Sequence, residues 1–277
     1  MNTPRKQRQH SGHLSSSQSP VVGALLVHGL NGSKRDMVEV EEMLCLHGVV
    51  TENILLPGHG SEVRDMLSLG WPEWAAAVQH ELHVLKQRCD VVFLIGHSLG
   101  GALCLHTAAH EEVAGVVSMC APLHLHPWLR PAVHVAKRIT PLLPTLREDV
   151  RNPVARRLYT RDVYRWTPMA PVASMLKYLP QLRTELPQVT VPVLVIAALH
   201  DHVVPVRDGR EIYRLLGSKE KHLVTLHRSY HVIMKDHDQE EVFAKTLAFV
   251  QRHTTTSNRQ QAFSEQVEQD KSQDQTA

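Results

Sequence analysis

The stretch VVFLIGHSLGG at residues 91–101 constrains the fold of this chain more than any other segment. Its apolar run predicts a buried strand that ends near Gly96, and Leu99–His110 is predicted as a helix. Ser98 therefore falls on a sharp turn between the two, flanked by Gly96 and Gly100. Glycine leaves room where a Cβ would collide with the neighbouring backbone. The pattern G-x-S-x-G in this setting predicts a nucleophile elbow with an exposed serine hydroxyl.

Strand and helix patterns alternate on both sides of this turn. The further predicted strands are short apolar runs at residues 21–27, 49–56, 113–120, 191–199 and 222–227. The further predicted helices lie at residues 36–47, within 70–88, and at 206–216 and 239–253. Because several runs are apolar on both faces, they indicate a mostly parallel central sheet flanked by helices, which is an α/β fold.

The alternation stops in the middle of the chain. Nine of the 16 prolines lie between Pro127 and Pro187, so only short helices are expected there, one of them beginning at Asn152-Pro153. We interpret residues 123–190 as a small inserted helical cap between two core segments, 20–122 and 191–253. Residues 1–19 and 254–277 are predicted to be disordered tails.

Composition excludes several classes of protein. The 277 residues carry a formal charge of +2 and no nucleic-acid motif, so a nucleic-acid partner is not expected. No secretory h-region and no long apolar segment is found, so we expect a cytoplasmic protein without integral membrane association. The four cysteines lack a CxxC spacing and are predicted to be buried, reduced thiols.

The cap segment is basic. From Arg130 to Arg165 there are nine Lys or Arg residues and three Asp or Glu residues. Such a run is either a solvated face or a surface for transient contact with anionic lipid, and the sequence leaves both open.

A serine hydroxyl needs a base to become a nucleophile, and the base needs an orienting acid. Asp201 follows the predicted strand at 191–199, and His231 lies between the last predicted strand and the closing helix. The order Ser98, Asp201, His231 along the chain is that of an α/β-hydrolase triad. These three residues are therefore the predicted catalytic residues.

An oxyanion hole needs two backbone donors. The N–H of Leu99, directly after the serine, is one candidate, and the N–H of Leu30 in the loop after the first strand is the other. Leu30, His97 and Leu99 are also predicted to bind substrate.

The segment HLHPW at residues 124–128 raises the question of a metal. His124 and His126 supply only two ligands, with no third at suitable spacing, so neither a metal site nor a cofactor is expected. We expect these histidines and Trp128 to line the hinge of the cap.

Six short segments follow one another along the chain in an order that indicates a known family: HGLNGS, LPGHG, GWPEW, GHSLGG, LHDHVVP and SYHVIMKDHDQEEVF. Over residues 22–122 and 191–252 the chain resembles the bacterial carboxylesterase and monoacylglycerol lipase group of the α/β-hydrolase fold. The resemblance implies a small helical cap and cofactor-free hydrolysis of short- to medium-chain esters or monoacylglycerols. It also implies Ser98, Asp201 and His231 as the triad, with Leu30 and Leu99 as oxyanion donors.

Two alternatives stay open at this point. The same triad serves thioesterases, acyltransferases, amidases and peptidases, because the fold does not fix the leaving group. A catalytically idle protein of this fold that binds a ligand is the other alternative.

Overall fold

A computed structural model describes residues 19–124, 133, 140–144, 149–159 and 166–254. The predicted tails lie outside the described residues except at positions 19 and 254, and so do long parts of the predicted cap. The division into core and cap therefore stays a prediction.

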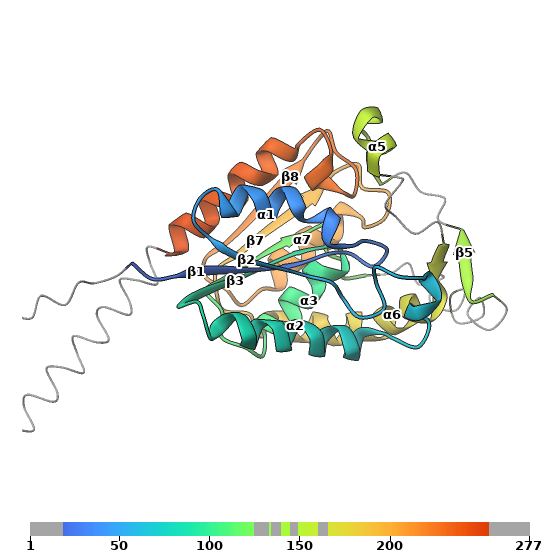
Figure 1. Cartoon of the computed structure of the whole chain (residues 1–277), viewed down its shortest axis with the longest axis horizontal. Coiled ribbons are helices and arrows are strands. Elements are labelled where there is room, and N and C mark those ends of the chain that lie inside the picture. Colours follow the sequence, from blue (N-terminus) through green and yellow to red (C-terminus); the bar gives the residue numbers. More distant parts are fainter. Residues whose placement is uncertain (1–18, 125–132, 134–139, 145–148, 160–165, 255–277) are drawn as a thin grey trace, which may run out of the picture.

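A six-stranded sheet forms the centre of the molecule (Figure 1). Its spatial order is β2-β1-β3-β4-β7-β8, and every neighbouring pair is parallel. The strands are β1 (Val22–Val27), β2 (Val50–Ile54), β3 (Val91–His97), β4 (Gly115–Met119), β7 (Val193–Ala198) and β8 (Lys221–Leu226). Every residue of β3, β4 and β7 is buried, as their uninterrupted apolar runs predict, whereas β8 at the edge is only partly covered. The predicted α/β fold with a mostly parallel sheet is confirmed.

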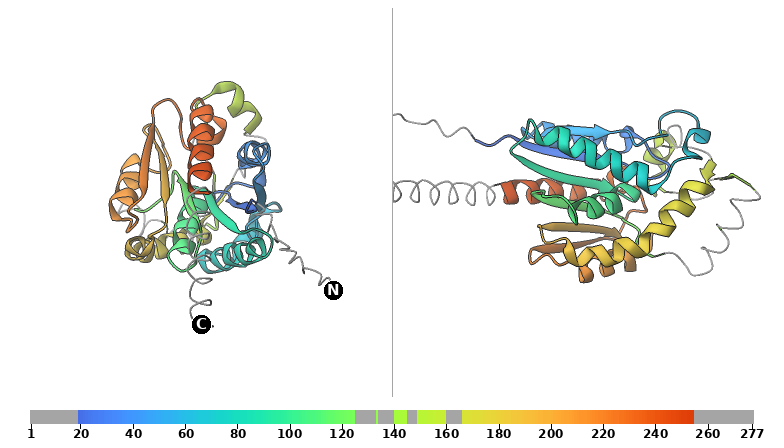
Figure 2. Two further views of the ribbon diagram at one scale, coloured as in Figure 1. Left: turned by 90° about the vertical axis from the view of Figure 1, so that its left-hand side faces the viewer. Right: turned by 90° about the horizontal axis from the view of Figure 1, so that it is seen from below.

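Helices cover both faces of the sheet. One face carries α2 (Trp71–Lys86), α3 (Leu99–Ala108), α6 (Met169–Glu185) and α7 (Val206–Leu215), whose apolar residues join one core cluster. The other face carries α1 (Val38–Cys45) and the closing helix at residues 239–254, which form a second cluster. Figure 1 shows α1 and the closing helix above the sheet, and the right view in Figure 2, seen from below, shows α2, α3 and α6 across its other face. Short 3-10 helices occupy Lys34–Asp36, Val63–Met66, Leu186–Gln188 and Ile233–Lys235.

The described part of the cap segment contains strands as well as helices. β5 (Leu142–Pro144) and β6 (Trp166–Pro168) pair in antiparallel fashion, and α5 (Pro153–Tyr159) lies between them in the sequence. As predicted, Asn152 caps α5: its Oδ1 accepts the N–H of Val154 at 3.0 Å and of Ala155 at 3.3 Å.

The expectation of short helices only is wrong for α6. This helix has 17 residues and includes Pro180. Proline costs the helix one hydrogen bond, but burial of Leu176, Leu179 and Leu182 in the core cluster offsets that loss. Pro171 lies in the first turn, where its missing N–H has no intrahelical partner to lose.

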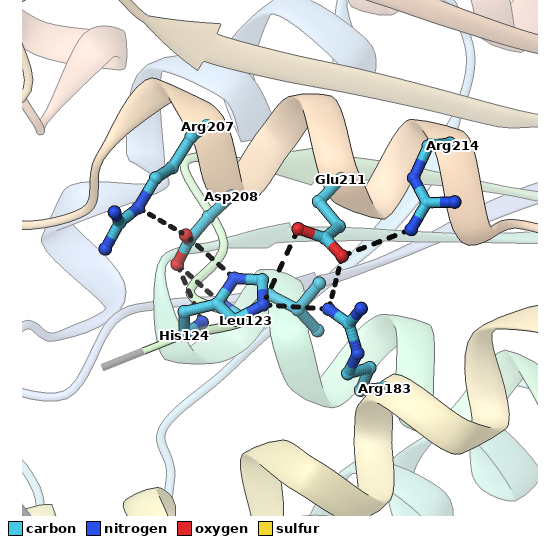
Figure 3. Close-up of polar contacts among 7 residues, drawn as sticks. All are labelled: Leu123, His124, Arg183, Arg207, Asp208, Glu211 and Arg214. Atoms are coloured by element: carbon cyan, nitrogen blue, oxygen red, sulfur yellow. Dashed lines mark hydrogen bonds and ion pairs between the residues drawn. The ribbon is translucent and has the colours of Figure 1, made fainter. Parts of the chain in front are cut away.

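The start of the predicted cap segment is anchored at Leu123 and His124 (Figure 3). The buried carboxylate of Asp208 on α7 accepts the N–H of Leu123 at 2.8 Å and of His124 at 2.9 Å. His124 Nδ1 donates to the same carboxylate at 3.2 Å, and Arg183 on α6 donates to His124 Nε2 at 2.8 Å. The predicted hinge position of His124 thus coincides with a polar anchor, whereas His126 and Trp128 lie outside the described residues.

All four cysteines carry free thiols. Cys89, Cys104 and Cys120 are buried as predicted, but the prediction is wrong for Cys45, which is exposed at the end of α1. There its Sγ lies 3.1 Å from the Thr51 hydroxyl.

Candidate active site

The turn after β3 places Ser98 in a strained conformation. Its φ of 54° and ψ of −120° lie outside the regions that L-residues favour. The strain follows from how closely α3 approaches the sheet: a Cβ on Gly100 would lie 2.1 Å from the Val27 carbonyl oxygen, and one on Gly96 would lie 2.3 Å from the Gly100 carbonyl oxygen. Ser98 is thereby held at the N-terminus of α3, at the carboxyl end of the parallel strands.

Three side chains from distant parts of the chain meet at this edge. The Ser98 hydroxyl lies 2.9 Å from His231 Nε2, and His231 Nδ1 lies 2.7 Å from Asp201 Oδ2. The second oxygen of Asp201 accepts the N–H groups of Val203 at 2.7 Å and Val204 at 2.8 Å. With the proton on Nδ1, His231 donates to Asp201 and presents Nε2 as an acceptor to the serine.

The surroundings set the charge of this pair. Burial by itself raises the pKa of Asp201, but the charge and hydrogen bond of His231 and the two backbone donors outweigh it, leaving the pKa below its ordinary value. Burial by itself lowers the pKa of His231, but the charge and hydrogen bond of Asp201 raise it above the ordinary 6.5. Asp201 therefore stabilises the positively charged, doubly protonated form of this imidazole.

The loop after β1 lies against the serine. A Cβ on Gly29 would stand 3.2 Å from Ser98 Cβ, so the backbone of Gly29 and Leu30 passes directly beside the nucleophile. Leu99 is the first residue of α3, and helix geometry leaves its N–H without an intrahelical acceptor. The two predicted oxyanion donors thus belong to segments that flank Ser98, and their role stays a prediction.

Two buried histidines hold this loop in place. His28 Nδ1 lies 2.8 Å from the Gly29 carbonyl oxygen, and His28 Nε2 accepts the N–H of Leu56 at 3.1 Å. His59 Nε2 donates to the Leu30 carbonyl oxygen. Burial, with His59 nearby, lowers the pKa of His28 to about 3, so its ring is neutral.

His97 contacts both the main chain and the ring of His231. Its Nε2 donates to the main-chain carbonyl of His231 at 3.0 Å, and the two ring centroids are 4.7 Å apart. The His97 side chain is buried, and burial, together with the charge of His231, lowers its pKa to about 3. The predicted substrate-binding role of His97 stays a prediction, whereas its hydrogen bond gives it a part in positioning His231.

Sequence reasoning identified the residues that converge but missed their supports. His59 lies in the LPGHG segment, one of the six that carry the family resemblance, and no role was predicted for it. Nothing in the local pattern indicates that His59 reaches the Leu30 carbonyl or that Asn31 Nδ2 donates to the Thr167 hydroxyl at 2.9 Å.

Cys120 is a further neighbour that the sequence did not reveal. It has a φ of 49° directly after β4, and its thiol, the Asp201 carboxylate and the His231 imidazole have ligand atoms within 4.8 Å of one another. Burial, and next the charge of Asp201, raise the pKa of the Cys120 thiol, so it is not a thiolate.

Comparisons with known proteins identify the family and the fold. The model of the family described as serine aminopeptidase, S33 matches residues 19–238. A thermostable monoacylglycerol lipase of Bacillus sp. (strain H-257) is 31% identical over 233 residues, which are 84% of this chain and 91% of the relative. A carboxylesterase of Bacillus subtilis (strain 168) is 22% identical over 82% of this chain and 92% of its own length.

Solved structures give the same fold. A structure reported with the metagenome-derived lipolytic enzymes LipS and LipT superposes with a TM-score of 0.79 at 30% identity, covering 85% of this chain and 95% of that one. The monoacylglycerol lipase of Paleococcus ferrophilus superposes with a TM-score of 0.68 at 23% identity, covering 83% and 94%.

The fold and the serine at the strand–helix turn define an α/β-hydrolase. The chain belongs to the serine aminopeptidase S33 family of this fold, and its similarity to lipases and carboxylesterases makes it an ester-hydrolysing serine hydrolase. The resemblance seen in the sequence is thereby confirmed.

We predict that the histidines of the site titrate very differently. In the folded chain, NMR of ¹⁵N-labelled histidine should show His231 losing its proton at a higher pH than an ordinary histidine, because Asp201 raises its pKa. His28 and His97 should stay neutral down to pH 5. Asp201→Asn should lower the pKa of His231, since the carboxylate charge that raises it is lost while burial remains; an unchanged titration in this variant would contradict the electrostatic account.

Proposed function

We propose that Ser98, His231 and Asp201 are the catalytic triad of this esterase and that monoacylglycerols are its natural class of substrate. The observation that carries the triad is the continuous hydrogen-bonded path from Asp201 through His231 to the Ser98 hydroxyl. The substrate class is supported by the 31% identical monoacylglycerol lipase, which aligns over most of both chains. A cytoplasmic location remains a prediction from the sequence.

The proposed reaction has two halves. His231 Nε2 takes the Ser98 proton as Oγ attacks the ester carbonyl, and the N–H groups of Leu30 and Leu99 stabilise the oxyanion. The intermediate collapses, the alcohol leaves with the proton from His231, and an acyl-enzyme remains. His231 then deprotonates a water molecule, which attacks the acyl group and releases the carboxylic acid and free Ser98.

Asp201 and His97 have supporting parts in this scheme. Asp201 fixes the imidazole tautomer and stabilises the imidazolium that forms when the serine proton arrives. His97 donates a hydrogen bond to the main-chain carbonyl of His231 and so helps to position the base beside Ser98.

Monoacylglycerols are presented at lipid surfaces, and the cap offers a surface that suits such contact. Val154 and Leu158 lie one helical turn apart on α5 and are 69% and 64% exposed. Arg151, Arg156 and Arg157 lie in or beside the same helix. Of the helices in the described part of the chain, none combines the length and hydrophobicity that a membrane span requires. We therefore infer transient contact of α5 with anionic lipid.

Aminopeptidase activity is the second candidate, because the matching family model is described as a serine aminopeptidase. It uses the same nucleophile and base, so only the leaving group separates the two.

Ser98→Ala should abolish esterase activity while the fold survives. Removing a serine nucleophile lowers kcat on the order of 10⁶-fold, and Asp201→Asn should lower it about 10⁴-fold through the wrong tautomer. Hydrolysis of p-nitrophenyl butyrate measures both effects, with circular dichroism as the fold control. Labelling by a fluorophosphonate should occur in the wild type and not in Ser98→Ala. Full activity of pure Ser98→Ala, or a wild type that never labels, would overturn the triad.

A substrate panel should separate the alternatives. We expect the highest kcat/KM for monoacylglycerols and p-nitrophenyl esters, and lower values for acyl-CoA thioesters and aminoacyl p-nitroanilides. The Ser98→Ala variant is the control for every substrate. A higher kcat/KM for an aminoacyl p-nitroanilide than for any ester would reassign the protein as a peptidase without disturbing the triad.

Replacing the exposed apolar pair on α5 should weaken lipid binding. We expect Val154→Glu with Leu158→Glu to reduce sedimentation with vesicles that contain phosphatidylglycerol, because apolar area is lost and the two added negative charges oppose those of the lipid. Leu46→Glu, at a position 84% exposed beside α1, is the matched control. Equal binding of the two proteins would contradict a role for α5.

A further inference from the structure

The end of α3 farthest from Ser98 carries a second cluster of chemically active side chains. His106 Nδ1 lies 2.7 Å from Glu185 Oε2, and His110 Nε2 lies 3.3 Å from Glu185 Oε1. One potential ligand atom from each of the three residues lies within 4.8 Å of the others. Glu185 is the last residue of α6, so the cluster joins two helices that come from distant parts of the chain.

The donor set matches a particular kind of metal. Two imidazole nitrogens and one carboxylate oxygen form the ligand set with which zinc keeps its fourth position open, for a water molecule. Zinc–ligand bonds of about 2.0–2.2 Å place neighbouring ligand atoms roughly 3.3–3.5 Å apart in a tetrahedral site. The His110–Glu185 distance of 3.3 Å has this value, and the His106–Glu185 distance of 2.7 Å, a hydrogen bond in the absence of metal, would lengthen by less than about 1 Å when both groups bind one ion. The spacing of four residues between His106 and His110 puts both rings on one side of the helix end.

The ligands are held in place by their neighbours. The Glu185 side chain is only 6% exposed, and Gln181 Nε2 donates to its Oε1 at 2.7 Å. The His106 ring packs edge-to-face against buried Trp71, with centroids 5.6 Å apart. The His110 side chain is 48% exposed and offers a path from solvent. Such pre-orientation of ligands by outer contacts is typical of metal sites.

We propose that His106, His110 and Glu185 bind one Zn²⁺ ion, which links α6 to α3. His106 is eight positions after Ser98, about 12 Å along the helix axis, so the ion takes no part in ester hydrolysis. Its effect is on stability: α6 lies in the last part of the predicted cap segment, and a metal bond between α6 and α3 fixes that part of the segment to the core. Without a metal, the same contacts form hydrogen bonds and ion pairs only.

The test is the change in melting temperature that Zn²⁺ produces. We expect the full chain to bind one Zn²⁺ by calorimetry and to melt at a higher temperature in its presence, because an ion that binds only the folded state stabilises it. His110→Ala, a change at a half-exposed side chain, should lower Zn²⁺ affinity at least about tenfold and remove most of the shift. Glu185→Gln should do the same, while keeping a hydrogen-bond acceptor for His106. Hydrolysis of p-nitrophenyl butyrate at 25 °C by His110→Ala should equal that of the wild type.

Two controls assign the ion to this site. His83→Ala removes another exposed histidine, paired with Glu111 at 3.0 Å but without a second imidazole, and should keep the full Zn²⁺ effect. Cys120→Ala removes a ligand from the other possible cluster, beside Asp201 and His231, and should also keep it. The proposal is overturned if Zn²⁺ does not raise the melting temperature of the wild type. It is equally overturned if the shift survives in His110→Ala or disappears in Cys120→Ala or His83→Ala.

Discussion

The close approach of α3 to the sheet is the constraint on which the site depends. With Cβ atoms at Gly96 and Gly100 the helix would have to move away, since backbone oxygens lie 2.1–2.3 Å from where those atoms would stand. The approach forces Ser98 into a strained conformation that costs on the order of 1–3 kcal/mol. Burial of α3 between the sheet, α2 and α6 offsets this cost. The strain is thus a consequence of packing, and it raises the hydroxyl above the strand ends.

The parallel sheet then explains why the partners of Ser98 are found where they are. In a parallel sheet all carboxyl ends lie at one edge, so the loops after β1, β3, β7 and β8 meet there although they are far apart in sequence. Each loop contributes one element of the site, and local hydrogen bonds fix its orientation. Asp201 accepts hydrogen bonds from the N–H groups that follow it, and the main-chain carbonyl of His231 accepts one from His97. The parallel sheet brings the site residues to one edge, and the hydrogen bonds of the loops orient their side chains.

The meeting of the site residues at one edge can be predicted from the sequence much better than the orientation of their side chains. The order of strands and helices and the positions of Ser98, Asp201 and His231 could be predicted, because apolar runs and the glycine-flanked serine are local signals. The hydrogen bonds from His59 to Leu30 and from His97 to His231 could not, because they depend on the packing of segments that no local pattern links. The length of α6 was mispredicted for the same reason: tertiary burial outweighed the local effect of Pro180. Proline density alone also gave no sign of the β5–β6 pair.

Three of the buried histidines around the serine, His28, His97 and His231, show how the environment divides roles among identical side chains. His28 and His97 bond to main-chain carbonyls, which are neutral, so burial dominates and both rings stay uncharged. His231 alone of the three faces a carboxylate, which stabilises its charged form. The ring of His97 lies only 4.7 Å from that of His231, and a charge on it would oppose the imidazolium that proton transfer from Ser98 creates. A neutral His97 is therefore a requirement of the proposed mechanism, and its burial supplies it.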